Sequence, residues 1–163
     1  MSMRIQHACY KFSPATISGL ISWWTHSLYS HCAIVVRDDA GAIIGVYEAI
    51  DSGYVKAASL AENHDAGTLV DLFDYDERFP VDAAAVLAEC ESMVGMKYDF
   101  AGIASFVTGG AIPQSPCRVF CSEANQRASM AGNVPLQNIP AASMHPAHVA
   151  MSLALKFTET IKI

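Results

Sequence analysis

The sequence lacks any apolar run that is long enough to cross a membrane. Its apolar runs, such as Cys32–Val36 and Ala42–Val46, are far shorter than the roughly 20 residues of a transmembrane helix. The first seven residues also lack the continuous apolar stretch of a signal peptide. We therefore expect a cytoplasmic protein by default, and release by lysis or non-classical export is compatible with the same sequence.

Positive charge is scarce as well. The chain has 10 Lys and Arg against 16 Asp and Glu, which gives a net charge of −6. There is no basic patch or Arg/Lys-rich helix, so we expect no nucleic-acid partner. Acidic residues gather at Asp71, Asp74, Asp76 and Glu77, but they lack the glycine and the terminal glutamate of a calcium loop. We interpret this segment as a solvated connection.

The cysteines do not form a recognisable framework. There are five, an odd number at irregular spacing, and no CxxC pair occurs. We therefore expect no disulfide framework and at least one free thiol.

Hydrophobic periodicity predicts one α+β domain over residues 1–163, with a small antiparallel sheet packed against helices. Strands are expected at residues 4–12, 31–37, 42–50, 54–56, 68–75 and 153–163. Helices are expected at residues 14–25, 80–94, 100–107 and 121–131, followed by a last short helix capped by Ser143.

The segment Val119–Ala128 follows a proline-broken loop and opens a helix, so Cys121 is expected at a helix N-terminus. Free backbone N–H groups and the helix dipole stabilise an anion there, and the thiolate is the nucleophilic form of cysteine. A lone cysteine is more often inert packing, so the chain must also supply a base and an orienting group.

Of the six histidines, His31 is the best placed to act as a base, because it opens an apolar strand and its side chain can face a cleft at the sheet end. Cys32 must then point to the opposite face and is expected in the core. His26 is the second choice. His145 and His148 have the i, i+3 spacing of a metal pair, but solvent exposure is the simpler interpretation.

Glu48 lies on the strand after His31, and a hairpin turn near Asp39 would place it roughly opposite this histidine. Its position alone fits an orienting carboxylate and a strand residue on a wet sheet face equally well. Tyr98 precedes a helix and can either donate to an oxyanion or form a wall of the cleft. Asp99 and Glu123 lie in first turns of helices, where acids cap and complement the dipole.

Four segments together carry a resemblance. They are a histidine heading an apolar strand (residues 29–36), a strand ending in Tyr47-Glu48-Ala49, a Gly-x-x-Tyr-Asp-Phe stretch (residues 95–100) and Phe120-Cys121-Ser122-Glu123. Their order resembles the circularly permuted branch of the NlpC-type papain-like cysteine hydrolases, which includes YaeF/YiiX-like proteins and LRAT-like lipid acyltransferases. In that branch the histidine precedes the cysteine.

This resemblance implies a permuted papain-like fold with Cys121 as nucleophile, His31 as base and Glu48 as third member. It places Tyr98 beside the nucleophile, and we add Ser122 and His26 as oxyanion or substrate-cleft candidates. The implied reaction is cleavage of an amide or peptide bond through a thioester. It needs no metal and no organic cofactor.

Several alternatives stay open. The family includes enzymes acting on cell-wall peptides, on N-acyl amino acids and on lipid esters, so the substrate is a peptide, an amide or a lipid amide, and a membrane-surface substrate fits the apolar composition. A non-enzymatic binding module on the same fold is a second class. A zinc protein using Cys117, Cys121, His145 and His148 is a third. The sequence does not define an oligomeric state.

Overall fold

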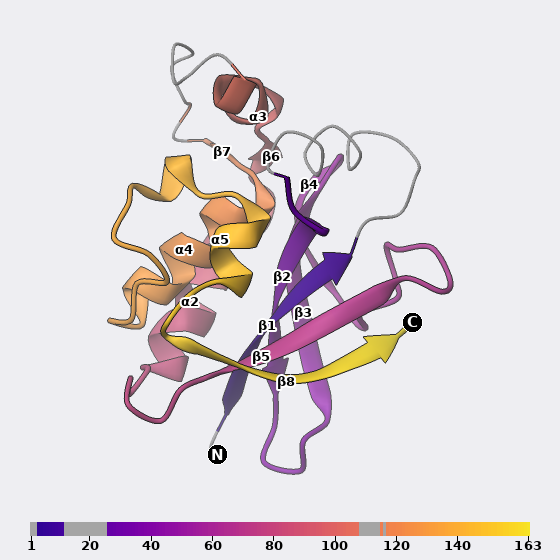
Figure 1. Cartoon of the computed structure of the whole chain (residues 1–163), viewed down its shortest axis with the longest axis vertical. Coiled ribbons are helices and arrows are strands. Elements are labelled where there is room, and N and C mark those ends of the chain that lie inside the picture. The colour runs from indigo at the N-terminus through magenta and orange to yellow at the C-terminus, as the bar shows by residue number, and fades with distance from the viewer. Residues whose placement is uncertain (1–2, 12–25, 108–114, 116) are drawn as a thin grey trace.

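The computed structural model describes residues 3–11, 26–107, 115 and 117–163. A six-stranded antiparallel sheet with the strand order β4-β3-β2-β1-β5-β8 forms its centre (Figure 1). The strands are β1 (Arg4–Lys11), β2 (Tyr29–Arg37), β3 (Ile43–Ile50), β4 (Gly53–Ala57), β5 (Leu69–Tyr75) and β8 (Leu155–Lys162). A separate parallel pair joins β6 (Lys97–Tyr98) to β7 (Arg118–Val119).

Helices cover one face of this sheet. They are α2 (Ala83–Met93), α4 (Cys121–Ala131) and α5 (Pro146–Ala150), preceded by a short 3-10 turn η1 (Ala141–Ser143), whereas α3 (Phe100–Val107) lies beyond the sheet end (Figure 1). Successive side chains of β2 point to opposite faces of the sheet, so this strand contributes apolar residues to both faces. Cys32 and Ile34 join the helix-facing core, and Ala33 and Val35 join a second apolar cluster on the opposite face.

Most predicted elements are confirmed within one to three residues. The helix expected at residues 14–25 lies outside the described residues. The α2 helix begins at Ala83, later than expected, because the Asp82 carboxylate accepts hydrogen bonds from two amides of the first turn. The predicted cap at Ser143 was wrong: Ser143 belongs to η1, and His145 precedes α5 with Pro146 at its first position.

The interpretation of the acidic segment as a solvated connection was also wrong for Asp71, which lies in β5 and is only 4% exposed. Its carboxylate accepts hydrogen bonds from the hydroxyls of Tyr29 and Thr160, both at 2.6 Å, and it pairs with the Lys11 ammonium at 2.9 Å. These partners offset the cost of burying a charge, which periodicity in the sequence does not reveal.

The segment that leads to Tyr98 is tied to the free edge of β4. The Tyr54 N–H donates to the Met96 carbonyl at 2.8 Å, and the Gly95 N–H donates to the Tyr54 carbonyl at 2.9 Å. At Gly53 (φ +127°) a Cβ would lie 2.5 Å from the Met96 carbonyl oxygen. Glycine is therefore required at position 53 both by its backbone conformation and by this close approach.

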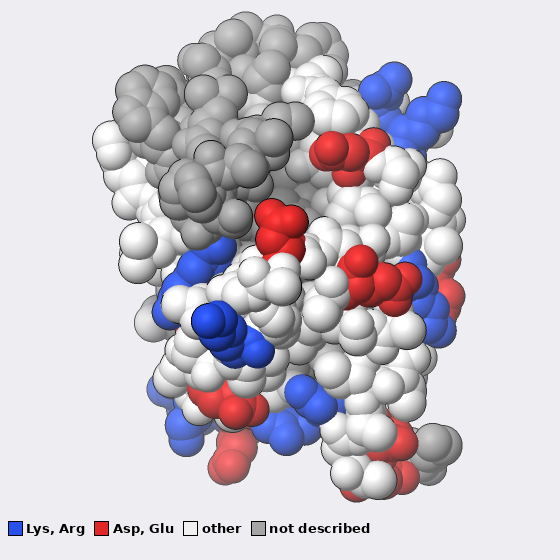
Figure 2. Space-filling model, turned by 90° about the vertical axis from the view of Figure 1, so that its right-hand side faces the viewer, with Lys and Arg blue, Asp and Glu red and all other residues white. Residues whose placement is uncertain are grey.

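Among the described residues, no helix has the length and apolar character to span a bilayer. Figure 2 shows one face of the molecule, on which acidic and basic side chains are interspersed rather than gathered by sign.

Candidate active site

Cys121 is the first residue of α4, as the sequence predicts, and it is 3% exposed. Phe120 occupies the N-cap position with extended backbone angles and provides no side-chain hydrogen bond to the first turn. Because α4 packs against β2, the start of the helix lies over the strand that carries His31. The positive end of a helix dipole is thus directed at the Cys121 sulfur.

Glu48 pairs with Ala33 across the β2–β3 ladder, so it is displaced by two residues from His31 but shares its face. The imidazole reaches this carboxylate diagonally, and His31 Nε2 donates to Glu48 Oε2 at 2.9 Å. Glu48 is 1% exposed. The sequence left the role of this carboxylate open, and in the structure Glu48 is bonded to the predicted base.

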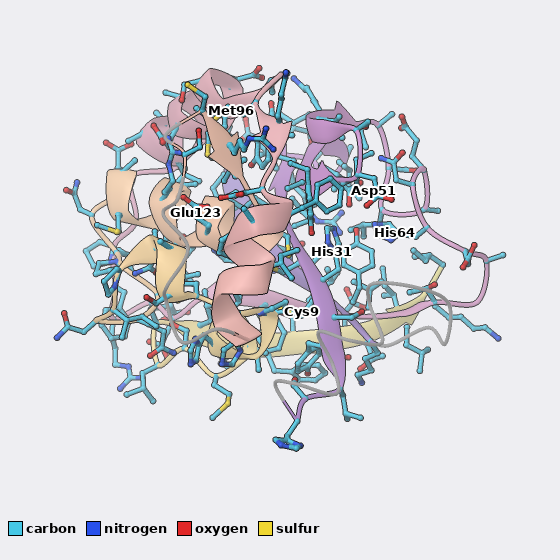
Figure 3. The ribbon with its side chains drawn as sticks, turned by 90° about the horizontal axis from the view of Figure 1, so that it is seen from above. Cys9, His31, Asp51, His64, Met96 and Glu123 are labelled. Carbon is cyan, nitrogen blue, oxygen red and sulfur yellow. The ribbon has the colours of Figure 1, made fainter. Side chains whose placement is uncertain are left out.

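Two further groups bind Glu48, and sequence reasoning missed both. His64 Nε2 donates to Glu48 Oε2 at 2.8 Å, and the Asn63 side-chain amide donates to Oε1 at 2.9 Å. Both come from the turn-rich segment after β4, which carries no periodic pattern. The adjacent polar pair Asn63-His64 was the only available signal. Figure 3 shows His31 and His64 beside each other, and their ring centroids are 5.2 Å apart.

The charges of this cluster are mutually stabilised. Burial alone would lower the pKa of His31, but hydrogen bonds to Cys121 and Glu48 raise it to about 10. The pKa of Cys121 is held well below its usual value by a hydrogen bond from Cys32 and by His31, against the opposing effect of burial. The pKa of Glu48 is also lowered, because its bonds from His31 and His64 outweigh burial. These pKa shifts favour a thiolate at Cys121, an imidazolium at His31 and an ionised carboxylate at Glu48.

The expectation that Cys32 belongs to the core is confirmed, but it is not merely packing. The Cys32 thiol lowers the pKa of Cys121, and Cys9 lies opposite Cys32 on β1. All five cysteines are free thiols in the structure, and Cys117 is the exposed one.

The three remaining predicted cleft residues differ in their surroundings. Tyr98 is 8% exposed, and burial together with the negative charge of Cys121 raises its pKa, so its phenol keeps its proton. The buried Ser122 hydroxyl donates to the Met144 carbonyl at 2.9 Å, which gives it a structural contact and no support as a cleft residue. His26 is exposed in the turn before β2, with φ of 48°.

A second buried histidine, His7 on β1, lies on the helix-facing side of the sheet. Its Nδ1 bonds to the Asn125 side-chain oxygen at 2.7 Å, and its Nε2 bonds to the Tyr75 hydroxyl at 3.0 Å. All of its partners are uncharged, and burial lowers its pKa to about 4. His7 therefore joins β1 to α4 as a neutral ring.

Within the described part of the chain, one group of side chains is close enough to hold a metal ion. It consists of His31, Glu48 and His64, whose ligand atoms lie within 4.8 Å of one another. Imidazole nitrogen and carboxylate oxygen suit a zinc-class ion. The zinc set expected as an alternative, Cys117, Cys121, His145 and His148, does not assemble: His145 and His148 instead stack at 3.5 Å at the start of α5.

The α+β fold with its six-stranded antiparallel sheet recurs in a solved structure. The chain is similar to the crystal structure of metalloprotein yiiX from Escherichia coli O157:H7, DUF1105, with a TM-score of 0.67 and 17% sequence identity over 98% of each chain. The likeness at this identity shows a common fold, in keeping with the YiiX-like resemblance of the sequence. No family model and no curated protein matches the chain.

Proposed function

We propose that the protein is a cysteine hydrolase that cleaves an amide or peptide bond through a thioester at Cys121. One observation carries this proposal: the Cys121 thiol at the start of α4 and the His31 imidazole shift each other's pKa towards the charged forms, and His31 Nε2 is bonded to the buried carboxylate of Glu48. A nucleophile, a base and an orienting group in this sequence of contacts form the arrangement of activated-nucleophile enzymes.

The imidazole has a defined orientation in this mechanism. Its Nε2 is bonded to Glu48, so Nδ1 is the ring nitrogen available to Cys121. The thiolate attacks the substrate carbonyl, and the imidazolium protonates the leaving amine as the thioester forms. His31 then takes a proton from water, hydroxide attacks the thioester, and the acid product leaves.

Charge that develops on the carbonyl oxygen needs donors. The Cys121 backbone N–H lies at the uncapped start of α4, and the buried Tyr98 phenol retains its proton beside the sulfur. We assign these two groups to the oxyanion. The acyl group of the substrate is not defined by them, and hydrolysis of an N-acyl or lipid amide uses the same steps as hydrolysis of a peptide.

Thiol labelling tests the nucleophile. Iodoacetamide at low concentration and mildly acidic pH is expected to modify Cys121 first, measured by peptide mass spectrometry, because the thiolate is the reacting form. Cys117 provides an internal control, since it is exposed and lies outside the triad. Cys121→Ala should remove the fast phase, whereas equal labelling of Cys117 and Cys121 would contradict the proposal.

Turnover is tested with a panel of aryl amides and aryl esters. The expected result is an acyl adduct on Cys121 that is detected by intact mass and lost in Cys121→Ala. A reactive thiol that forms no acyl adduct with any member of the panel would instead favour a binding module on the same fold.

The structural neighbour is described as a metalloprotein. In this chain, the residues that would hold such an ion are His31, Glu48 and His64. A bound zinc-class ion supplies Lewis-acid chemistry. The proposed thiol reaction is carried by the side chains of Cys121, His31 and Glu48.

A further inference from the structure

The carboxylate of Glu48 accepts more hydrogen bonds than a cysteine triad requires, because His31 and His64 both donate to its Oε2 atom. We infer that His31, Glu48 and His64 form a binding site for one zinc-class divalent ion, with Nε2, Oε2 and Nε2 as ligand atoms and water in the fourth position. While the ion is bound, His31 cannot act as the acid and base of the proposed reaction.

The geometry of the three ligand atoms is close to that of a zinc site. Both Nε2 atoms lie within 2.9 Å of the same carboxylate oxygen, and all three atoms lie within 4.8 Å of one another. Metal–ligand distances of about 2.0–2.1 Å at tetrahedral angles separate ligand atoms by about 3.4 Å. To bind an ion, each ring nitrogen must therefore move away from Oε2 by roughly half an ångström. The two nitrogens, which lie within 4.8 Å of each other, must also come to about 3.4 Å apart, so the rings reorient when the ion binds.

Each ligand is already oriented by a second contact. Asn63 donates to Glu48 Oε1 at 2.9 Å, which leaves Oε2 for the ion. The His64 ring stacks on Tyr10 at 3.9 Å between ring centroids, and the His31 ring lies against the same tyrosine at 5.1 Å. Contacts of this kind fix the ring plane and the tautomer of metal-binding histidines.

The ligand set selects the class of ion. Two imidazoles and one carboxylate suit Zn²⁺ and its neighbours such as Co²⁺ and Ni²⁺, whereas Ca²⁺ and Mg²⁺ prefer oxygen ligands alone. The Glu48 side chain is fully buried, and the side chains of His31 and His64 are 14% and 15% exposed. An ion therefore has access to the site from the histidine side.

The consequence for catalysis rests on the proposed function, whereas the site itself does not. Coordination removes the hydrogen from Nε2 of each ring, and a neutral imidazole then carries its proton on Nδ1. In His31 that proton faces Cys121 and is retained by the metal-bound ring, so the residue no longer passes protons between the leaving group and water. The ion thereby holds the triad in a resting state.

The test measures binding directly, in the chelator-treated full-length protein. Titration with Co²⁺ should give the visible absorption of a tetrahedral complex at one equivalent, and Zn²⁺ should displace it. His64→Gln is expected to weaken Co²⁺ and Zn²⁺ binding by more than about 100-fold, since even the loss of an orienting contact costs 10–100-fold. The matched control is His148→Gln, which removes a partly buried histidine from the stacked pair on α5 and should leave affinity unchanged.

Three outcomes would overturn the inference: no tetrahedral Co²⁺ spectrum in the wild type, equal affinity in His64→Gln, or loss of binding in His148→Gln. A sulfur-to-cobalt charge-transfer band would also overturn it, because it would make Cys121 a ligand. Thermal unfolding in chelator verifies that both variants fold. Labelling of Cys121 in metal-free protein is read separately, so a failed metal site and a failed nucleophile give different results.

Discussion

His7 and His31 lie on neighbouring strands of one sheet, and their environments give them opposite properties. His7 faces the helices among uncharged partners, and its pKa falls to about 4. His31 faces the other way toward Glu48 and, at the strand end, meets the Cys121 thiol, and its pKa rises to about 10. Burial acts in the same direction on both rings, so the charge of the partners decides which histidine can exchange protons with a nucleophile.

The largest expected effect comes from removing the charged histidine. In His31→Asn the midpoint of the pH–rate profile for iodoacetamide labelling of Cys121 should rise from well below the ordinary cysteine value toward that value, about 8.5. His7→Asn should leave that midpoint within a few tenths of a unit. A shift of similar size in both variants would show that the two histidines are not distinguished by their partners.

Stability should respond to the two histidines with opposite signs. The folded pKa of His7, about 4, lies below the unfolded value of 6.5, so its neutral form favours the native state above pH 6.5 and this advantage is lost as pH falls toward 4. The loss amounts to about 3 kcal/mol. His31 contributes stability that is complete below pH 6.5 and is lost as pH rises toward 10.

Urea unfolding of the wild type and His7→Asn at pH 7 and pH 4.5 measures how the free energy of unfolding changes with pH because of His7. The wild type should lose more stability than the variant over this interval. Parallel slopes for the two proteins would mean that His7 is protonated in the native state.

Glu123 extends the comparison to a partly buried carboxyl group that has no bond to a cation among the described residues. Glu123 lies in the first turn of α4, and burial raises its pKa to about 7, opposed by the charge of Arg127. Its ionised form therefore destabilises the native state increasingly between pH 4.5 and 7 and by a constant amount above. Because the group is partly exposed, we expect Glu123→Gln to gain only about 1–2 kcal/mol at pH 8 and little at pH 4.5.

Chemical denaturation of Glu123→Gln and the wild type at those two pH values provides the measurement. A gain of equal size at both would indicate better packing of the amide rather than removal of a buried charge.

The smallest expected effect concerns the thiol that donates to Cys121. Cys32→Ala removes this donor, and the labelling midpoint of Cys121 should rise by about one pKa unit, equivalent to about 1.4 kcal/mol. Cys9→Ala is the matched control, since Cys9 lies opposite Cys32 on β1 and is equally buried. Equal shifts in both variants would assign the effect to loosened packing.

The sequence predicts the parts of this site that regular elements position. The position of His31 at the head of a strand predicted its place at the site, strand alternation placed Cys32 in the core, the hairpin brought Glu48 near His31, and the helix start was expected at Cys121. These inferences work because periodicity and caps are local signals. The resemblance to a permuted papain-like family was the source of the roles that we propose for these residues.

Other contacts are tertiary and leave no local pattern. His64 reaches Glu48 from an irregular segment, and Asp71 gains its partners only when β8 and the start of β2 meet β5. Ser122 follows Cys121 directly but turns to the carbonyl of Met144, because successive residues of a helix point in different directions.

The distances along the chain between His31, Glu48 and Cys121 have a consequence for dynamics. His31 and Glu48 are 17 residues apart within one hairpin, whereas Cys121 is 90 residues beyond His31 and reaches it only when α4 docks on the sheet. A momentary undocking of this helix would return the thiol to an ordinary acidity without breaking the hairpin. The rate of Cys121 modification at low pH therefore reports the fraction of molecules in which α4 is docked, and it should fall under conditions in which hydrogen exchange shows this helix opening.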